Sequence, residues 1–199
     1  MKKLSFILVS LLLIFKVSFA NTYSTDPQTF VAELVNDAIA KLSSKDINKA
    51  DKKVFIEQLA KENVDINALG LYTLGELRKT ADKKSINNFQ QEFQKYFLKS
   101  LTSRLTDYSS NIFEVTSAEK KNSSYTIVKS RVFGDNDQPE IKIDWRIYTK
   151  NPEKPLIRDL IVEGLSLART QKEEFGSILN SNNNDINILI SKLKEFTKS

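Results

Sequence analysis

The sequence contains no cysteine and no histidine among its 199 residues. Without these residues the chain cannot form a disulfide, a common zinc site, a Ser-His-Asp triad or a Cys-His catalytic pair. Glycine and proline are also scarce, at five and four residues, and no glycine-rich phosphate-binding loop is present. The groups left for any chemistry are carboxylates, hydroxyls, lysine and tyrosine.

The first 20 residues have the pattern of a secretory signal peptide. Residues 1–3 give a basic start, residues 4–15 form an apolar run, and Ser18-Phe19-Ala20 has small residues at the two positions that a signal peptidase reads. Lys16 ends the apolar run well short of the roughly 20 residues that a membrane-spanning helix needs. We therefore expect cleavage after Ala20, and we expect residues 21–199 to form a single, freely diffusing domain outside the cytoplasm.

Removal of the signal peptide changes the charge of the chain. Subtracting Lys2, Lys3 and Lys16 from the 30 lysine and arginine residues leaves 27, against 25 acidic residues. A near-neutral domain with interspersed charges lacks the clustered basic face that is typical of nucleic-acid-binding proteins. We therefore expect no nucleic-acid partner.

The spacing of apolar residues changes along the chain. A helical period predicts helices at residues 27–43, 65–79 and 82–108. A further helix, between the first two of these, is predicted to begin at a cap, Asp46. Gly70 and Gly75, inside the helix predicted at residues 65–79, indicate close packing or a bend.

Beyond residue 111 the period becomes 2, which predicts strands at residues 112–118, 125–133, 141–148 and 156–163. The connections are too short for parallel crossovers, so we expect an antiparallel meander. Two closing helices are predicted, at residues 167–179 and after Asp185. This order predicts an α+β domain, in which helices pack on a curved, four-stranded or slightly larger antiparallel sheet and enclose a hydrophobic cavity.

No residues are spaced for catalysis. Asp159 and Glu163 would lie about 13–14 Å apart on one strand face, which is too far for a glycosidase pair. Ser166 lacks a histidine partner and the second glycine of a nucleophile elbow, and a helix cap after Gly164 explains it better. We assign no catalytic and no metal-binding residue.

The apolar surface predicts a ligand cavity between helices and sheet. Its expected lining combines the densest apolar faces of the helices and strands, namely Leu69, Leu74, Phe93, Phe97, Ile143, Trp145, Ile147, Leu160, Val162 and Leu165. The same pattern also fits an ordinary core, and periodicity alone does not decide between the two.

Two stretches carry a family resemblance. Residues 158–167 include Glu163-Gly164-Leu165-Ser166, and the helix that follows contains an aromatic residue, Phe175, and has an Ile178-Leu179 ending. Earlier, Leu74-Gly75 precedes a helix with an F-x3-F and L-x3-L-x2-Y pattern. These features resemble the MlaC family of periplasmic phospholipid-binding proteins, also called the toluene-tolerance family. Two departures are Leu165, where a valine is common in the family, and Leu77-Arg78, where the family has an aromatic pair.

The resemblance implies a non-enzymatic, periplasmic carrier that shuttles diacyl phospholipid between the outer and inner membranes and so maintains outer-membrane lipid asymmetry. The implied partners are an inner-membrane Mla ABC transporter with an MCE-domain subunit and an outer-membrane MlaA-type lipoprotein complex. A monomer without any cofactor besides its lipid is expected. Two alternatives stay open, namely an exported hydrolase on a related α+β scaffold and a lipid-free structural or adaptor domain.

We predict that the envelope form of the protein begins at Asn21, because the small residues Ser18 and Ala20 precede that position. N-terminal sequencing or intact-mass measurement of protein from the envelope fraction tests this. A retained Met1 together with tight membrane association would contradict the prediction.

Overall fold

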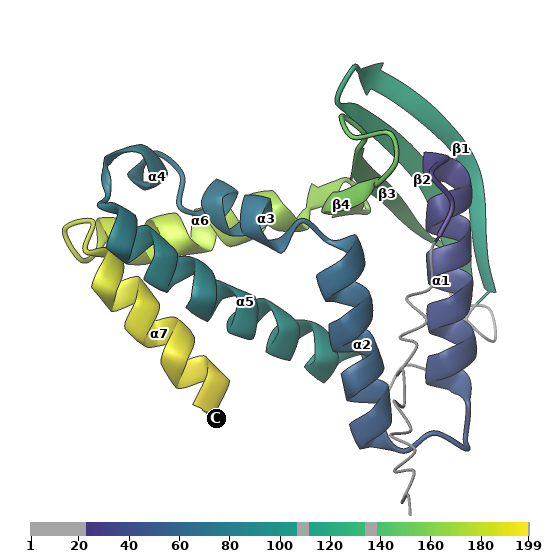
Figure 1. Ribbon diagram of the computed structural model, residues 1–199, viewed down its shortest axis with the longest axis horizontal. Coiled ribbons are helices and arrows are strands. Elements are labelled where there is room, and N and C mark those ends of the chain that lie inside the picture. The colour runs from purple at the N-terminus through teal and green to yellow at the C-terminus, as the bar shows by residue number, and fades with distance from the viewer. Residues whose placement is uncertain (1–22, 107–111, 134–138, 199) are drawn as a thin grey trace, which may run out of the picture.

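Figure 1 shows the computed structural model, which describes residues 23–106, 112–133 and 139–198. The helices of the described residues are α1 (Pro27–Ser43), α2 (Lys49–Asn63), α3 (Ile66–Thr73), α4 (Leu77–Thr80), α5 (Lys83–Leu105), α6 (Leu167–Asn180) and α7 (Ile186–Lys198). The strands are β1 (Ile112–Asn122), β2 (Tyr125–Phe133), β3 (Ile141–Tyr148), β4 (Leu156–Val162) and β5 (Leu165–Ser166). The predicted α+β order is confirmed, whereas the predicted signal peptide lies outside the described residues. Within those residues, no helix combines the length and apolar character needed to cross a membrane.

The sheet is an open antiparallel meander in the order β1-β2-β3-β4-β5, as the short connections predict. The fifth strand was not predicted. It forms because Glu163 and Gly164 take positive φ angles of 48° and 80°, and the chain turns back at once. A register shift between β3 and β4, next to Arg146, marks a β-bulge that bends the sheet.

Helix α1 covers one face of the sheet (Figure 1). Strand alternation sends Trp145 and Ile147 of β3 to this face, where they pack with Phe30 and Val31 of α1. The indole nitrogen of Trp145 donates a hydrogen bond of 2.8 Å to Ser130 Oγ, so its polar atom is satisfied inside the apolar layer. This layer is one of two hydrophobic cores.

The second core lies among the helices, away from the sheet (Figure 1). Phe89 and Phe93, the two phenylalanines of the F-x3-F pattern in α5, meet Phe175 of α6 edge-on at ring-centroid distances of 6.2 and 6.3 Å. Helix α7 lies beside α5 and adds Leu189 and Leu193 to the cluster. Helices that precede the sheet in sequence and helices that follow it therefore share one core.

Two predicted helix boundaries are wrong. The cap of α2 is Asn48 and not Asp46. The helix predicted at residues 65–79 is two helices, because Gly75 takes a φ of 59° that ends α3. The end predicted for the long helix, at residues 107–108, lies outside the described residues.

Gly70 marks a close approach between α3 and α5. A Cβ atom at this position would lie 2.9 Å from Cδ1 of Phe93, a distance that real Cβ contacts essentially never show. The Phe93 ring is itself held between Phe97 and Phe175. Close packing, one of the two roles predicted for this glycine, is therefore confirmed.

We predict that Gly70→Ala lowers the free energy of unfolding by about 1–3 kcal/mol, because the added methyl group overpacks a site whose neighbours cannot yield. Gly176→Ala is the matched control. It also lies within a helix, but its Cβ would meet nothing within 4 Å, so the free energy should rise by roughly 0.5–1 kcal/mol. Urea unfolding measures both, and shifts of the same sign would contradict the prediction.

Candidate functional site

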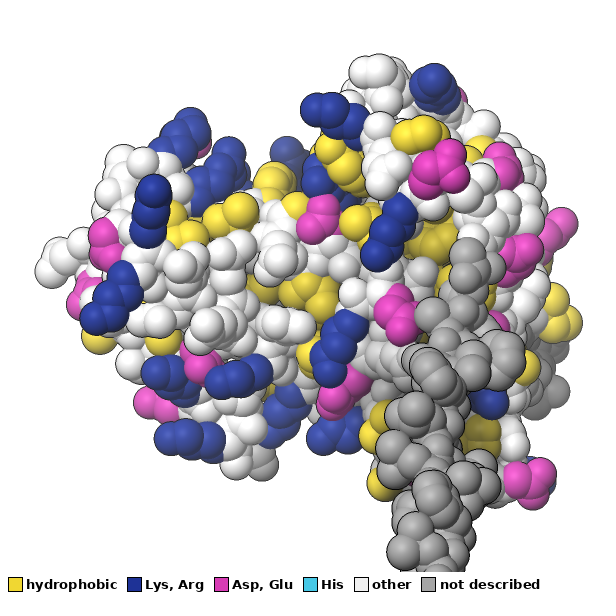
Figure 2. All heavy atoms as spheres, viewed as in Figure 1, with side chains coloured by type: hydrophobic (Ala, Val, Ile, Leu, Met, Phe, Trp, Pro, Cys, Tyr) yellow, Lys and Arg dark blue, Asp and Glu magenta, His cyan; other side chains and the backbone are white. Residues whose placement is uncertain are grey.

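A cleft of about 870 Å³ opens between the helices and the sheet face that α1 does not cover. Figure 2 shows it as a hollow in the surface, with hydrophobic side chains along its floor and Lys and Arg side chains at its sides. The volume falls near the upper end of the range for sites that bind small molecules, roughly 300–1,000 Å³. We take this cleft as the candidate site.

The two walls of the cleft differ in chemistry. The helical wall is mainly apolar and consists of Ala68, Leu69, Leu71 and Tyr72 of α3, Ala168 of α6 and Arg78 of α4. The strand wall mixes charged and apolar groups, and its members are Lys121, Asn122, Tyr125, Ile127, Lys129, Asp144, Arg146, Arg158 and Ile161. A ligand with one apolar and one charged end matches this division.

Of the residues predicted to line the cavity, Leu69 lines the cleft. Leu74 and Phe93 lie in the helical core, and Phe97 packs against it. Trp145 and Ile147 lie in the core beneath α1, and Ile143 and Leu160 pack against that core. Val162, the last residue of β4, is half-buried, and Leu165, the first residue of β5, is 58% exposed.

The structure therefore does not bring the predicted sheet residues and helix residues together. Because α1 covers the apolar face of β3, the opposite face, which carries Asp144 and Arg146, forms the wall of the cleft. The alternation of β3 already separated these two faces. It did not indicate which helices cover each of them.

The bulge also changes which residues of β4 face the cleft. Strict alternation places Ile157 and Ile161 on one face and Leu160 on the other. In the structure Ile157 and Leu160 both belong to the core beneath α1, while Ile161 lines the cleft. The extra residue of the bulge is Arg158, which sequence reasoning missed and which lines the cleft as well.

Arg158 joins the strand wall to the helical wall. Its Nε and Nη2 donate to Oδ2 of Asp65 at 2.8 and 2.7 Å, and its Nη1 donates to the hydroxyl of Tyr125 at 2.8 Å. The guanidinium also lies 3.5 Å from the ring centroid of Tyr148. Burial acts to lower the pKa of Arg158, but the hydrogen bonds to Tyr125 and Asp65 outweigh it and raise that pKa. Arg158 is therefore a fixed cation.

Asp65 also organises α3. Its Oδ1 accepts a hydrogen bond of 3.1 Å from the backbone nitrogen of Ala68, which caps the helix. Its own backbone nitrogen donates to the carbonyl of Ile157 in β4 at 2.9 Å. The helix that forms most of the apolar wall thus begins at a point tied to the sheet.

Asp159 performs a similar task for α6. Its buried carboxylate accepts the hydroxyl of Ser166 at 2.6 Å and the backbone nitrogen of Ala168 at 3.0 Å. Ser166 in turn accepts a hydrogen bond from the backbone nitrogen of Arg169, so it caps the helix as its position after Gly164 predicts. In the described residues no group of three or more acidic side chains is placed to hold a metal ion.

Residues 31–195 of this chain match the MlaC protein family. The chain belongs to the MlaC family. This confirms the resemblance carried by the segment after Arg158 and by the helix that contains Phe89 and Phe93. No curated protein matches the chain.

A solved structure shares the MlaC fold. It is the phospholipid-binding protein from Ralstonia solanacearum in complex with a phospholipid, and it superimposes with a TM-score of 0.70 over 90% of this chain and 98% of its own. The two sequences are 18% identical. At this identity the likeness establishes the fold.

We predict that Asp65→Asn lowers the free energy of unfolding by roughly 2–3 kcal/mol, because the amide breaks a largely buried ion pair and leaves Arg158 without its counter-charge. The Asp65 and Arg158 side chains are 19% and 24% exposed. Glu173→Gln, which breaks an exposed pair with Arg169, is the control and should change stability by less than about 0.5 kcal/mol. Equal effects in urea unfolding would refute the assignment.

Proposed function

We propose that this protein is a non-enzymatic carrier that binds one diacyl phospholipid in the cleft. The observation that carries the proposal is the division of the cleft into an apolar helical wall and a charged strand wall. Membership of the MlaC family and the phospholipid complex of the Ralstonia solanacearum protein support it. The acyl chains would lie against α3 and α6, and the headgroup would lie against the strands.

A carrier of this kind lowers the free-energy barrier for moving a lipid through water. Burial of one methylene group is worth about 0.8 kcal/mol, so passage of a lipid with roughly 30 methylenes through bare water costs on the order of 20 kcal/mol. An apolar wall that replaces water lowers this barrier without any chemical step. Such binding does not require the catalytic residues that the sequence lacks.

We propose that the acyl chains first contact Leu69. This side chain belongs both to the cleft and to the surroundings of the helical core, so it offers a continuous apolar path toward Leu74, Phe93 and Phe97. The chains would reach those residues when α3 and α5 separate. The acyl chains would reach the opposite face of the sheet only if α1 left it; that face carries the other predicted residues Ile143, Trp145, Ile147, Leu160 and Val162. Contact with Leu165 would require the lipid to extend to β5.

The proposed cellular role follows the family. After cleavage near Ala20, a periplasmic monomer would receive lipid from and deliver lipid to two membrane complexes. These are an inner-membrane Mla ABC transporter with an MCE-domain subunit and an outer-membrane MlaA-type lipoprotein complex. The match to the MlaC family over residues 31–195 supports this role.

Native mass spectrometry of protein purified from cells tests lipid binding, and co-purified phospholipid is the expected result. Ile161→Asp and Leu69→Asp should each reduce bound lipid by about tenfold or more, because each replaces an apolar group of the lining with a carboxylate, which disfavours an acyl chain or a phosphate beside it. Val54→Asp is the control, since Val54 is 64% exposed on α2, remote from the cleft.

Thermal unfolding of each variant separates loss of binding from loss of fold. Folded Ile161→Asp and Leu69→Asp variants that retain as much lipid as the wild type would show that the cleft is not the lipid site. Wild-type protein that repeatedly purifies without lipid, and takes up none from vesicles, would count against the carrier function and in favour of an adaptor domain.

A further inference from the structure

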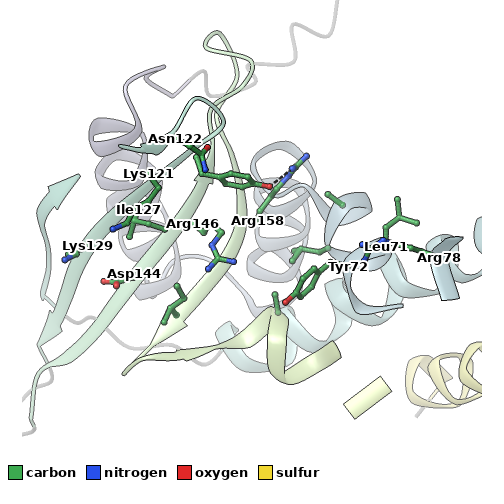
Figure 3. Close-up of a pocket in the computed structure, with 15 residues that line it drawn as sticks. Leu71, Tyr72, Arg78, Lys121, Asn122, Ile127, Lys129, Asp144, Arg146 and Arg158 are labelled. Atoms are coloured by element: carbon green, nitrogen blue, oxygen red, sulfur yellow. Dashed lines mark hydrogen bonds between the residues drawn. The ribbon is translucent and has the colours of Figure 1, made fainter. Parts of the chain in front are cut away.

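The strand wall of the cleft presents its side chains in ordered rows. Across β2, β3 and β4 the register aligns Ile127, Arg146 and Asp159 in one row. The next row aligns Lys129, Asp144 and Ile161. Figure 3 shows Arg146 projecting into the cleft between these strands and Tyr72 of α3.

Cations outnumber acids on the lining. Lys121, Lys129, Arg146, Arg158 and Arg78 line the cleft, and Asp144 is the one acidic side chain among its lining residues. Some of these cations are already committed. Arg158 is held by Asp65, and Lys121 pairs with Glu119 at 2.6 Å.

Two other cations of the cleft lining keep their charge available for a ligand. Within the described parts of the chain, Lys129 and Arg78 form no ion pair, although Lys129 stands opposite Asp144 across the strands. A negative group that enters the cleft therefore meets a positive field. A positive group meets repulsion from the same side chains, and Asp144 is the one lining side chain that attracts it.

Arg146 is the best-placed anion ligand. Its Nη1 lies 3.5 Å from Oδ2 of Asp159, and the oxygens of that buried carboxylate are already hydrogen-bonded to Ser166 and Ala168. Asp159 thus steadies the guanidinium from one side. The Arg146 side chain is 42% exposed, and no hydrogen bond from it to another described residue is formed. Its remaining donors face the cleft, and the guanidinium fork matches the geometry of a phosphate group.

We propose that Arg146 binds the phosphate of the lipid headgroup, and that the cleft prefers phospholipids with a net negative headgroup over zwitterionic ones with the same acyl chains. This inference rests on the proposed carrier function. The phosphate is common to both lipid classes, so the preference comes from the second group of the headgroup. Lys129 and Arg78 repel the ammonium of a zwitterionic headgroup, whereas they do not repel a neutral glycerol.

Uptake from mixed vesicles tests the preference. Delipidated protein is incubated with vesicles of equimolar phosphatidylglycerol and phosphatidylethanolamine that carry identical acyl chains, and the bound lipids are quantified by mass spectrometry. Wild type should enrich phosphatidylglycerol about three- to tenfold, the size expected of a partly screened, charge-assisted contact. Lys129→Gln should bring the ratio toward one, because it removes a lining cation that repels the ammonium. Arg146→Gln should instead reduce the uptake of both lipids, since both carry the phosphate, and Arg146→Lys should restore part of that uptake, because lysine keeps the charge without the fork.

Asp144→Asn sharpens the test. Removal of the one acidic lining group should increase the enrichment of phosphatidylglycerol. The opposite result would be a wild type that prefers phosphatidylethanolamine and an Asp144→Asn variant that loses this preference. It would overturn the proposal, since Asp144 and Arg146 together would then recognise a zwitterion. Lys53→Gln, on the exposed surface of α2, removes one positive charge outside the cleft and should leave the ratio unchanged.

The remaining outcomes separate this inference from the proposed function. Equal uptake of the two lipids by wild type, a lipid ratio that folded Lys129→Gln leaves unchanged, or an uptake that folded Arg146→Gln leaves unchanged, overturns the headgroup inference while lipid binding stands. Failure to take up either lipid contradicts the carrier function itself. The last experiment is a titration with inorganic phosphate at constant ionic strength. Saturable binding of phosphate, together with no lipid preference in the vesicle experiment, would assign Arg146 to a free anion instead.

Discussion

The carboxylate of Asp65 determines how the two parts of the molecule meet. One oxygen caps α3, the other receives two hydrogen bonds from Arg158 of β4, and the backbone nitrogen of the same residue donates to Ile157. A single residue therefore fixes where the helix begins and how it lies against the sheet. The distance between the two walls of the cleft depends on this junction.

The same arrangement recurs at the other helix that borders the cleft. Helix α6 begins beneath the buried carboxylate of Asp159, which lies next to Arg146 as Asp65 lies next to Arg158. A carboxylate at a helix N-terminus is favoured by the partial positive charge there. In each case an arginine of the sheet balances the charge of the carboxylate at the helix start, so the two arginines of the strand wall also help to place the helices.

The sequence predicts most of the fold because its periods are clear. The strands of the meander follow directly from alternation, and the bounds of α1 at residues 27–43 follow from the helical period. The site was harder to predict, because alternation in β3 separates Trp145 from Arg146 without indicating which face α1 would cover. The bulge that exposes Arg158 leaves no trace in hydropathy, since it inserts one residue into an otherwise regular strand.

The shared helical core also sets the order in which the chain can fold. The hairpins of the meander join strands that are neighbours in sequence, and such local contacts close early. Phe89 and Phe93 must instead wait for Phe175 and Leu189, which lie beyond the whole sheet in the chain. Closure of so long a loop becomes favourable only when the contacts it brings offset the lost chain entropy. We therefore expect the hairpins of the sheet to form before either core is complete, because Phe30 and Trp145, which pack together beneath α1, are also far apart in the chain. The cleft acquires its second side only once the C-terminal helices are in place.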